Sequence, residues 1–146
     1  MIRLVLWFLP FFPLSLGGCG GETISPSCRE ATLHSDFAWI NANILQPSCA
    51  NFSSCHDAVL PKEMLDLTTD AAYAELVSVP SQQVPALHLV EPGDPPNSYL
   101  MIKLGLGAPD PRLADMTGLM PLGQNDLFCQ EKVDAIERWI LAGAAQ

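Results

Sequence analysis

Two cysteines and a histidine form the group of residues best suited to chemistry in this chain. Cys49 and Cys55 are separated by five residues, and His56 follows Cys55 directly. Sulfur and imidazole ligate metals. In the motif Cys-x-x-Cys-His, two thiols bind the vinyl groups of a heme while the histidine ligates its iron. This chain keeps the terminal Cys-His pair but has a longer spacing between the cysteines, so the pattern indicates heme attachment in an altered form.

The same residues allow two other interpretations. A disulfide between Cys49 and Cys55 would close a small loop without strain and stabilise the fold by roughly 2 kcal/mol in the chain-entropy model. His56 would then be an ordinary exposed or capped histidine. A copper(I) site is the third interpretation, because Cys49, Cys55, His56 and Met120 are soft ligands of the kind that this ion prefers.

The N-terminus predicts an exported lipoprotein. Residues 1–18 contain Arg3 and then an apolar run over 4–16, which is too short for a membrane span and typical of a signal-peptide core. The run ends in Leu-Gly-Gly-Cys, which resembles a bacterial lipobox, so we expect Cys19 to become the acylated N-terminus. An ordinary secretory signal with an incidental cysteine is the alternative. Residues 19–27 would be a tether to the membrane, and the protein would lie in the cell envelope, facing the periplasm or on the outer membrane.

Composition limits the partners that the protein can bind. The 146 residues include 7 Lys+Arg and 16 Asp+Glu, a net charge of −9, which argues against nucleic acid as a partner. Apolar residues make up 49% of the chain, which rules out disorder of the low-hydrophobicity kind, and 13 Pro and 10 Gly indicate long loops. We therefore expect one compact, loop-rich domain.

Helical periodicity predicts the elements that would position the cysteines and histidine. We expect short helices over residues 36–45, 70–77, 98–104 and 126–142. The residues that would start them are Ser35, Thr69, Asn97, and Asn125 or Asp126. The residues that would end them are Pro47, Pro80, Gly105 and Gly143. Long Pro/Gly-rich loops over 91–96 and 107–123 would connect them.

The order of these motifs resembles that of the cytochrome c-like domains of exported proteins and lipoproteins from soil proteobacteria and planctomycetes. The resemblance covers about residues 36–144 of the domain expected over 28–146. The matching segments are Pro47-Ser48-Cys49-Ala50, Cys55-His56, Tyr73-Ala74-Glu75-Leu76-Val77, Pro92-Gly93-Asp94-Pro95, Met120-Pro121 and Trp139-Ile140-Leu141-Ala142-Gly143-Ala144. It implies a small all-α fold of about four short helices.

The resemblance also implies roles for individual residues. Cys49 and Cys55 would be the thioether cysteines of heme c, His56 the proximal iron ligand and Met120 the distal ligand. A methionine sulfur opposite histidine raises the redox potential, and the proline after Met120 fixes φ in the ligand loop. Met116 is the competing sulfur ligand and His88 the competing nitrogen ligand.

A disulfide between Cys28 and Cys129 also follows from the resemblance. In cytochrome c folds the terminal helices pack together, which would bring these two cysteines close. Closing so long a loop would contribute about 4–5 kcal/mol in the chain-entropy model. Two free thiols are the alternative, although exported proteins rarely keep them.

The resemblance implies single-electron transfer by a lipid-anchored protein that catalyses no reaction itself. Its acidic surface would attract a basic redox protein as partner. The alternative is a heme-free structural or interaction lipoprotein on the same fold, stabilised by two disulfides.

Overall fold

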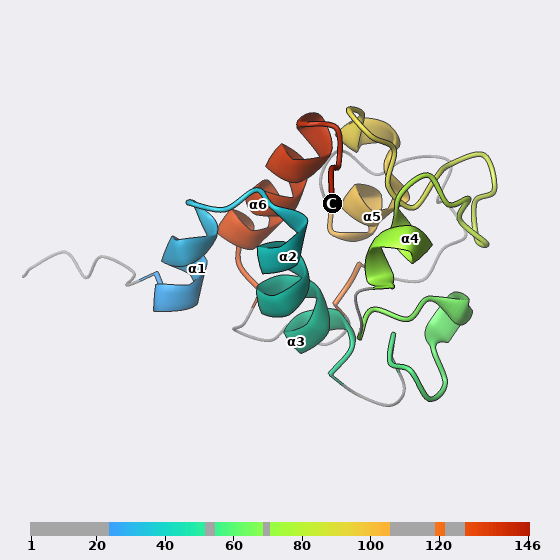
Figure 1. The fold of residues 1–146 in the computed structure, drawn as a ribbon, viewed down its shortest axis with the longest axis horizontal. Helices are drawn as coiled ribbons and strands as arrows, with labels where there is room; N and C mark the ends of the chain where they lie inside the picture. Colours follow the sequence, from blue (N-terminus) through green and yellow to red (C-terminus); the bar gives the residue numbers. More distant parts are fainter. Residues whose placement is uncertain (1–23, 52–54, 69–70, 106–118, 122–127) are drawn as a thin grey trace, which may run out of the picture.

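The computed structural model describes residues 24–51, 55–68, 71–105, 119–121 and 128–146, and Figure 1 shows their arrangement. These parts are helical and contain isolated β-bridges but no strand, so the expected all-α class is confirmed for them. The helices are α1 (Pro26–Ala31), α2 (Phe37–Ile40), η1 (Asn41–Leu45), α3 (Gln46–Cys49), η2 (Lys62–Met64), α4 (Ala72–Leu76), η3 (Pro95–Asn97), α5 (Tyr99–Lys103) and α6 (Gln130–Leu141).

The expected helix over 36–45 is longer than the sequence predicts. The α2, η1 and α3 segments follow one another directly, and η1 is a π-helical turn. Asp36 caps this unit, since its carboxylate accepts a hydrogen bond from the backbone N–H of Trp39 at 2.9 Å, so the expectation that Ser35 is the cap was wrong. The expectation that Pro47 ends the helix was also wrong. Pro47 lies in the first turn of α3, where a missing N–H is tolerated, and the chain stays helical to Cys49.

Helix α1 lies where the sequence suggested a tether. Ser25 caps it by accepting a hydrogen bond from the backbone N–H of Cys28 at 3.2 Å, and Pro26 takes the first helical position. The last two residues of the expected tether over 19–27 are therefore helical, and Cys28 lies inside a helix instead of before one. Helix α1 packs against α6.

The later helices agree with the expected positions but start later. Ser98, not Asn97, precedes α5, because Asn97 belongs to the η3 turn and its amide donates to the Asp94 carboxylate at 2.7 Å. Cys129 is the N-cap residue of α6 and not part of its first turn. The expected start residues Thr69, Asn125 and Asp126 lie outside the described residues. Gly105 and Gly143 follow α5 and α6 with positive φ, as expected for glycines that end helices.

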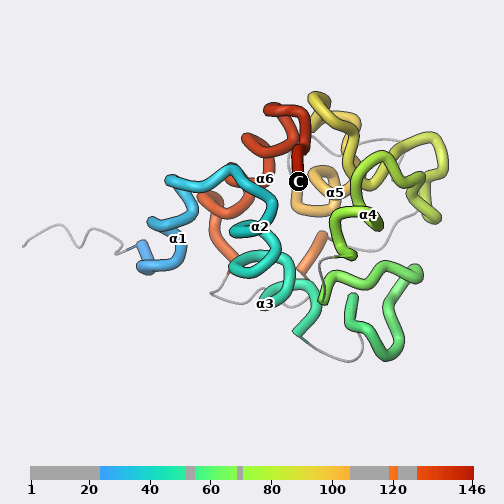
Figure 2. The backbone as a smooth tube through the Cα atoms, in the orientation of Figure 1, coloured from blue at the N-terminus to red at the C-terminus, as the bar shows by residue number. Residues whose placement is uncertain are grey.

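The core forms around α6. Trp139 is 2% exposed, and its ring lies 5.2 Å from that of Phe37 in α2. The C-terminal residues close over this region, because the Trp139 indole N–H donates to the carbonyl of Ala145 and the Tyr73 hydroxyl donates to that of Ala144. Figure 2 shows the first and last described helices side by side, which agrees with the packing of α1 on α6.

No described helix combines the length and the apolar character needed to cross a membrane.

Candidate functional site

Cys49 and Cys55 lie at the two ends of a short loop that follows α3. The loop folds back on itself, because the backbone N–H of His56 donates to the carbonyl of Cys49 at 3.1 Å. Both cysteines are free thiols, so the disulfide considered for this pair is not formed in the structure. Both side chains are partly buried. The loop thus presents two thiols and an imidazole from one short stretch of chain.

The thiol of Cys49 is held in its neutral form. Burial raises its pKa to about 12, and the nearby Cys55 thiol contributes further because two thiolates would repel. A buried neutral thiol is a poor nucleophile and a poor metal ligand until it loses its proton. In the folded chain the Cys49 thiol would therefore have to lose its proton before it could act as a nucleophile or a ligand.

The imidazole of His56 is oriented by the backbone of a later segment. Its Nδ1 lies 3.3 Å from the carbonyl oxygen of Leu65, and the carbonyl of His56 accepts a hydrogen bond from the N–H of Leu67 at 2.9 Å. The backbone of Lys62 contributes a second hydrogen bond to the ring, so two backbone groups hold the imidazole in place. Burial lowers the pKa of His56 and favours the neutral form, which is the form that ligates metals.

A tight turn brings Leu65 back to His56. The N–H of Lys62 donates to the carbonyl of Cys55 at 3.0 Å, and the next two residues, Glu63 and Met64, have φ values of 55° and 57°. Positive φ is unfavourable for residues other than glycine, and such conformations are concentrated at functional sites. Sequence analysis did not identify the Leu65 carbonyl as a site group, since a backbone oxygen has no signature in the residue types.

The backbone of Met120 is held by Lys103 at the end of α5. The backbone N–H of Met120 donates to the carbonyl of Lys103 at 2.7 Å, and the positive charge of Lys103 contributes to lowering the His56 pKa. Met120 is partly buried, and its peptide bond to Pro121 is cis. This hydrogen bond fixes the backbone of Met120 against α5, and sequence analysis did not identify Lys103 as its partner.

The competing ligands are placed differently. His88 pairs with Glu91, with 2.5 Å between Nδ1 and a carboxylate oxygen, so its ring already has an acidic partner. Met116 lies outside the described residues, as does the expected lipidation residue Cys19.

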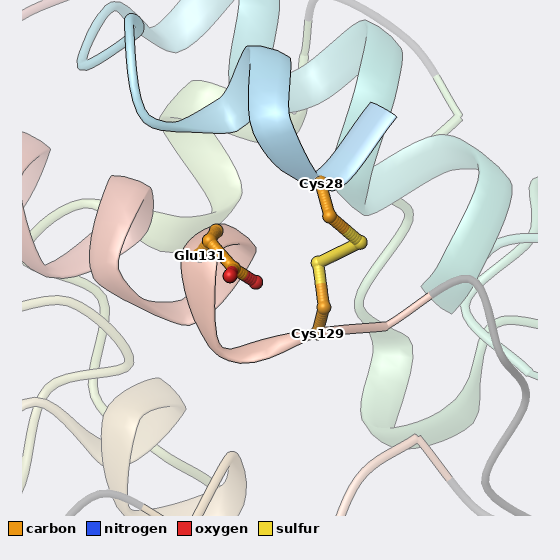
Figure 3. A group of neighbouring side chains, drawn as sticks. All are labelled: Cys28, Cys129 and Glu131. Carbon is orange, nitrogen blue, oxygen red and sulfur yellow. A yellow bond between two sulfur atoms is a disulfide. The ribbon is translucent and has the colours of Figure 1, made fainter. Parts of the chain in front are cut away.

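The disulfide between Cys28 and Cys129 is confirmed, with the two Cα atoms 6.1 Å apart (Figure 3). The Glu131 carboxylate lies beside the two sulfur atoms and close enough to complete a group of three potential metal ligands. The sulfur atoms are used in the disulfide, however, and are not the thiolates that a metal requires. This group is therefore a structural crosslink between α1 and the start of α6.

Cys49 lies at the edge of the main core, and the candidate donors are of the types that hold a heme. Cys49 packs against the main core together with other partly buried apolar residues, namely Ala50, Leu65, Leu104 and Phe128. Two thiols, a neutral imidazole and a thioether are the groups that would attach and ligate heme c. Two surface hollows of the described residues lie elsewhere, one along α2 and η1 and the other on α1.

Comparisons with known proteins give no match: no family model, no curated protein sequence and no solved structure is similar to this chain. The functional interpretation therefore depends on the residues and geometry described above.

Proposed function

We propose that this protein is an exported, lipid-anchored, cytochrome c-like electron carrier. Cys49 and Cys55 would hold a heme through thioether bonds, and His56 and Met120 would ligate its iron. The bound heme would supply one-electron chemistry between ferrous and ferric iron. The observation that supports this proposal best is the partly buried imidazole of His56, which is oriented by the Leu65 carbonyl and follows directly on the second of two free thiols.

The chain's own groups would set the properties of the site. The Leu65 carbonyl would keep the His56 ring in one orientation and make its nitrogen a better donor. The main core, against which Cys49 packs, would limit the access of water at this side and thereby favour the less charged ferrous form. The net charge of −9 would attract a basic redox protein to the surface.

A pyridine hemochrome spectrum tests whether heme is attached. The protein should be purified from its native host or coexpressed with a complete heme-maturation apparatus, and we expect a spectrum typical of thioether-linked heme. A protein that carries no heme under both conditions would refute electron transfer as its function.

Substitution of the methionines tests the assignment of the distal ligand. Met120→Ala should abolish the near-infrared sulfur-to-iron band of the oxidised protein and lower its redox potential, because the electron-withdrawing thioether is lost. Met116→Ala should leave both nearly unchanged. Met64→Ala is the matched control, since Met64 is 74% exposed and belongs to the same loop as His56. Loss of the band in Met116→Ala instead would transfer the role to that residue.

A heme-free structural or interaction lipoprotein is the second candidate function. The observation that favours it is the core around Trp139, which is closed by protein side chains and crosslinked by the disulfide from Cys28 to Cys129. Such a protein would fold cooperatively without cofactor and would keep Cys49 and Cys55 as thiols or oxidise them to a second disulfide.

A further inference from the structure

Large exposed apolar side chains occur at two opposite ends of the described molecule. Ile24 and Leu33 lie just before and just after α1, and Leu33 is 81% exposed. Val59 and Leu60 are exposed in the loop that follows His56. Figure 1 shows α1 at one edge of the molecule and the segment that follows α3 near the opposite edge. The two surfaces are therefore separated by the body of the domain.

We propose that the α1 end, meaning α1 with Ile24 and Leu33, docks on the membrane that holds the lipid anchor. This inference rests on the proposed acylation of Cys19. Only four residues lie between Cys19 and Ile24, and the five Cα-to-Cα steps that join them span at most about 18 Å when fully extended. A tether of this length keeps the α1 end close to the lipid surface. The loop after His56 can then face away from the membrane.

The orientation of α1 sets that of the whole domain, because α1 is fixed to α6. The disulfide joins Cys28 to Cys129, and the guanidinium of Arg138 in α6 donates to the carbonyls of Ala31 and His34 at 2.7 and 2.9 Å. Ala31 and Cys28 are themselves buried. A membrane contact at α1 would therefore fix the orientation of the core as well, because α1 is rigidly attached to it.

The chemistry of the α1 surface suits a lipid interface. Leu33 lines a shallow hollow with Pro26, Arg29 and Glu30, and the Arg29 guanidinium donates to the carbonyl of Ile24 at 3.2 Å. Apolar side chains can enter the boundary between headgroups and acyl chains, and an arginine beside them can contact phosphate. Glu30 offsets the charge of Arg29, so this surface should bind a zwitterionic membrane and should depend on the acyl chains for its affinity.

Fluorescence quenching by brominated lipids tests this orientation. The acylated, full-length mature protein is bound to phosphatidylcholine vesicles with or without bromine on the acyl chains, and each variant is compared with the parent protein. Leu33→Trp places a reporter at the α1 end, and Leu60→Trp is the matched control because Leu60 is 73% exposed at the other end. The extra emission of L33W should fall roughly twofold or more on brominated vesicles, since side chains of docked segments reach the acyl boundary. The emission of L60W should not change.

The outcomes separate the docking from the anchor. Protein that carries the acyl group and binds vesicles, but in which L33W is not quenched, would overturn the docking and leave the anchor intact. Quenching of L60W would show that the opposite end faces the membrane and would also overturn the inference. An intact mass without an acyl group on Cys19 would overturn the anchor, and the docking with it.

Discussion

Removal of the disulfide between Cys28 and Cys129 should destabilise the protein strongly. The two cysteines are 101 residues apart in the sequence, so the bond restricts nearly the whole described chain when it unfolds. The chain-entropy model gives a loss of about 4.7 kcal/mol for a loop of this length. Small domains have a total stability of about 5–15 kcal/mol, so Cys28→Ala combined with Cys129→Ala should remove a third or more of it.

The assay is urea unfolding followed by the fluorescence of Trp139, which is buried in the folded protein. The double variant should unfold at a lower urea concentration and with a larger m-value, because its unfolded state is less compact than the crosslinked one. Its melting temperature should fall by roughly 15–25 °C. Reduction of the parent protein should reproduce this loss, whereas the double variant should not respond to the reductant.

A small effect would refute this reasoning. If the double variant lost less than about 1 kcal/mol, the crosslink would not be restricting the unfolded chain as the loop-closure argument requires. An unchanged m-value together with a large loss would place the effect in the folded state, in the contacts between α1 and α6.

Three further predictions concern single residues in the heme-free protein. Asp36→Ala should reduce stability by about 1 kcal/mol through loss of the helix cap, whereas Asp36→Asn should retain the cap. The hydrogen bond from the Trp39 N–H lowers the pKa of Asp36, so the parent protein should lose stability as the pH falls below about 4. Both variants should lose less, and urea titrations at several pH values measure the difference in unfolding free energy. Iodoacetamide at pH 8 should modify Cys55 well before Cys49, because a pKa of about 12 leaves only about 1 in 10⁴ molecules with Cys49 as the thiolate. Peptide mapping by mass spectrometry measures the two rates of modification, and their difference should vanish in denaturant. Burial lowers the pKa of His56, so the unfolded state takes up a proton first and stability should fall as the pH drops below about 6.5; His56→Gln should flatten this dependence in the same titrations.

Local signals in the sequence predicted the helical class but not all helix ends. Gly105 and Gly143 were recognised as ends because a positive φ there requires glycine. The expectation that Pro47 ends the helix was wrong because a π-helical turn precedes it, and the residue types do not predict such a turn. Helix α1 was missed although Ser25 and Pro26 form a typical helix start, since the segment is too short for periodicity to reveal.

Sequence analysis identified the side chains of the candidate site but not the backbone that orients them. The Leu65 carbonyl faces His56 only because Glu63 and Met64 adopt positive φ, and neither residue type favours that conformation. The contact between Met120 and Lys103 joins segments that have no local relation in the sequence. Such contacts depend on tertiary structure and cannot be obtained from residue spacing.

The packing of α1 against α6 has a consequence for how the chain reaches its folded state. Helix α1 gains its tertiary contacts only when α6 is present, because the residues that it packs against, the disulfide partner of Cys28 and the Arg138 donor to Ala31 all belong to α6 or its N-cap. Contacts between residues so distant in the sequence slow folding, since the intervening chain loses entropy before it gains these contacts. A chain emerging from a translocation channel with its N-terminus first would therefore stay open until its last residues had passed. The same delay would leave Cys49, Cys55 and His56 accessible to a modifying enzyme during export.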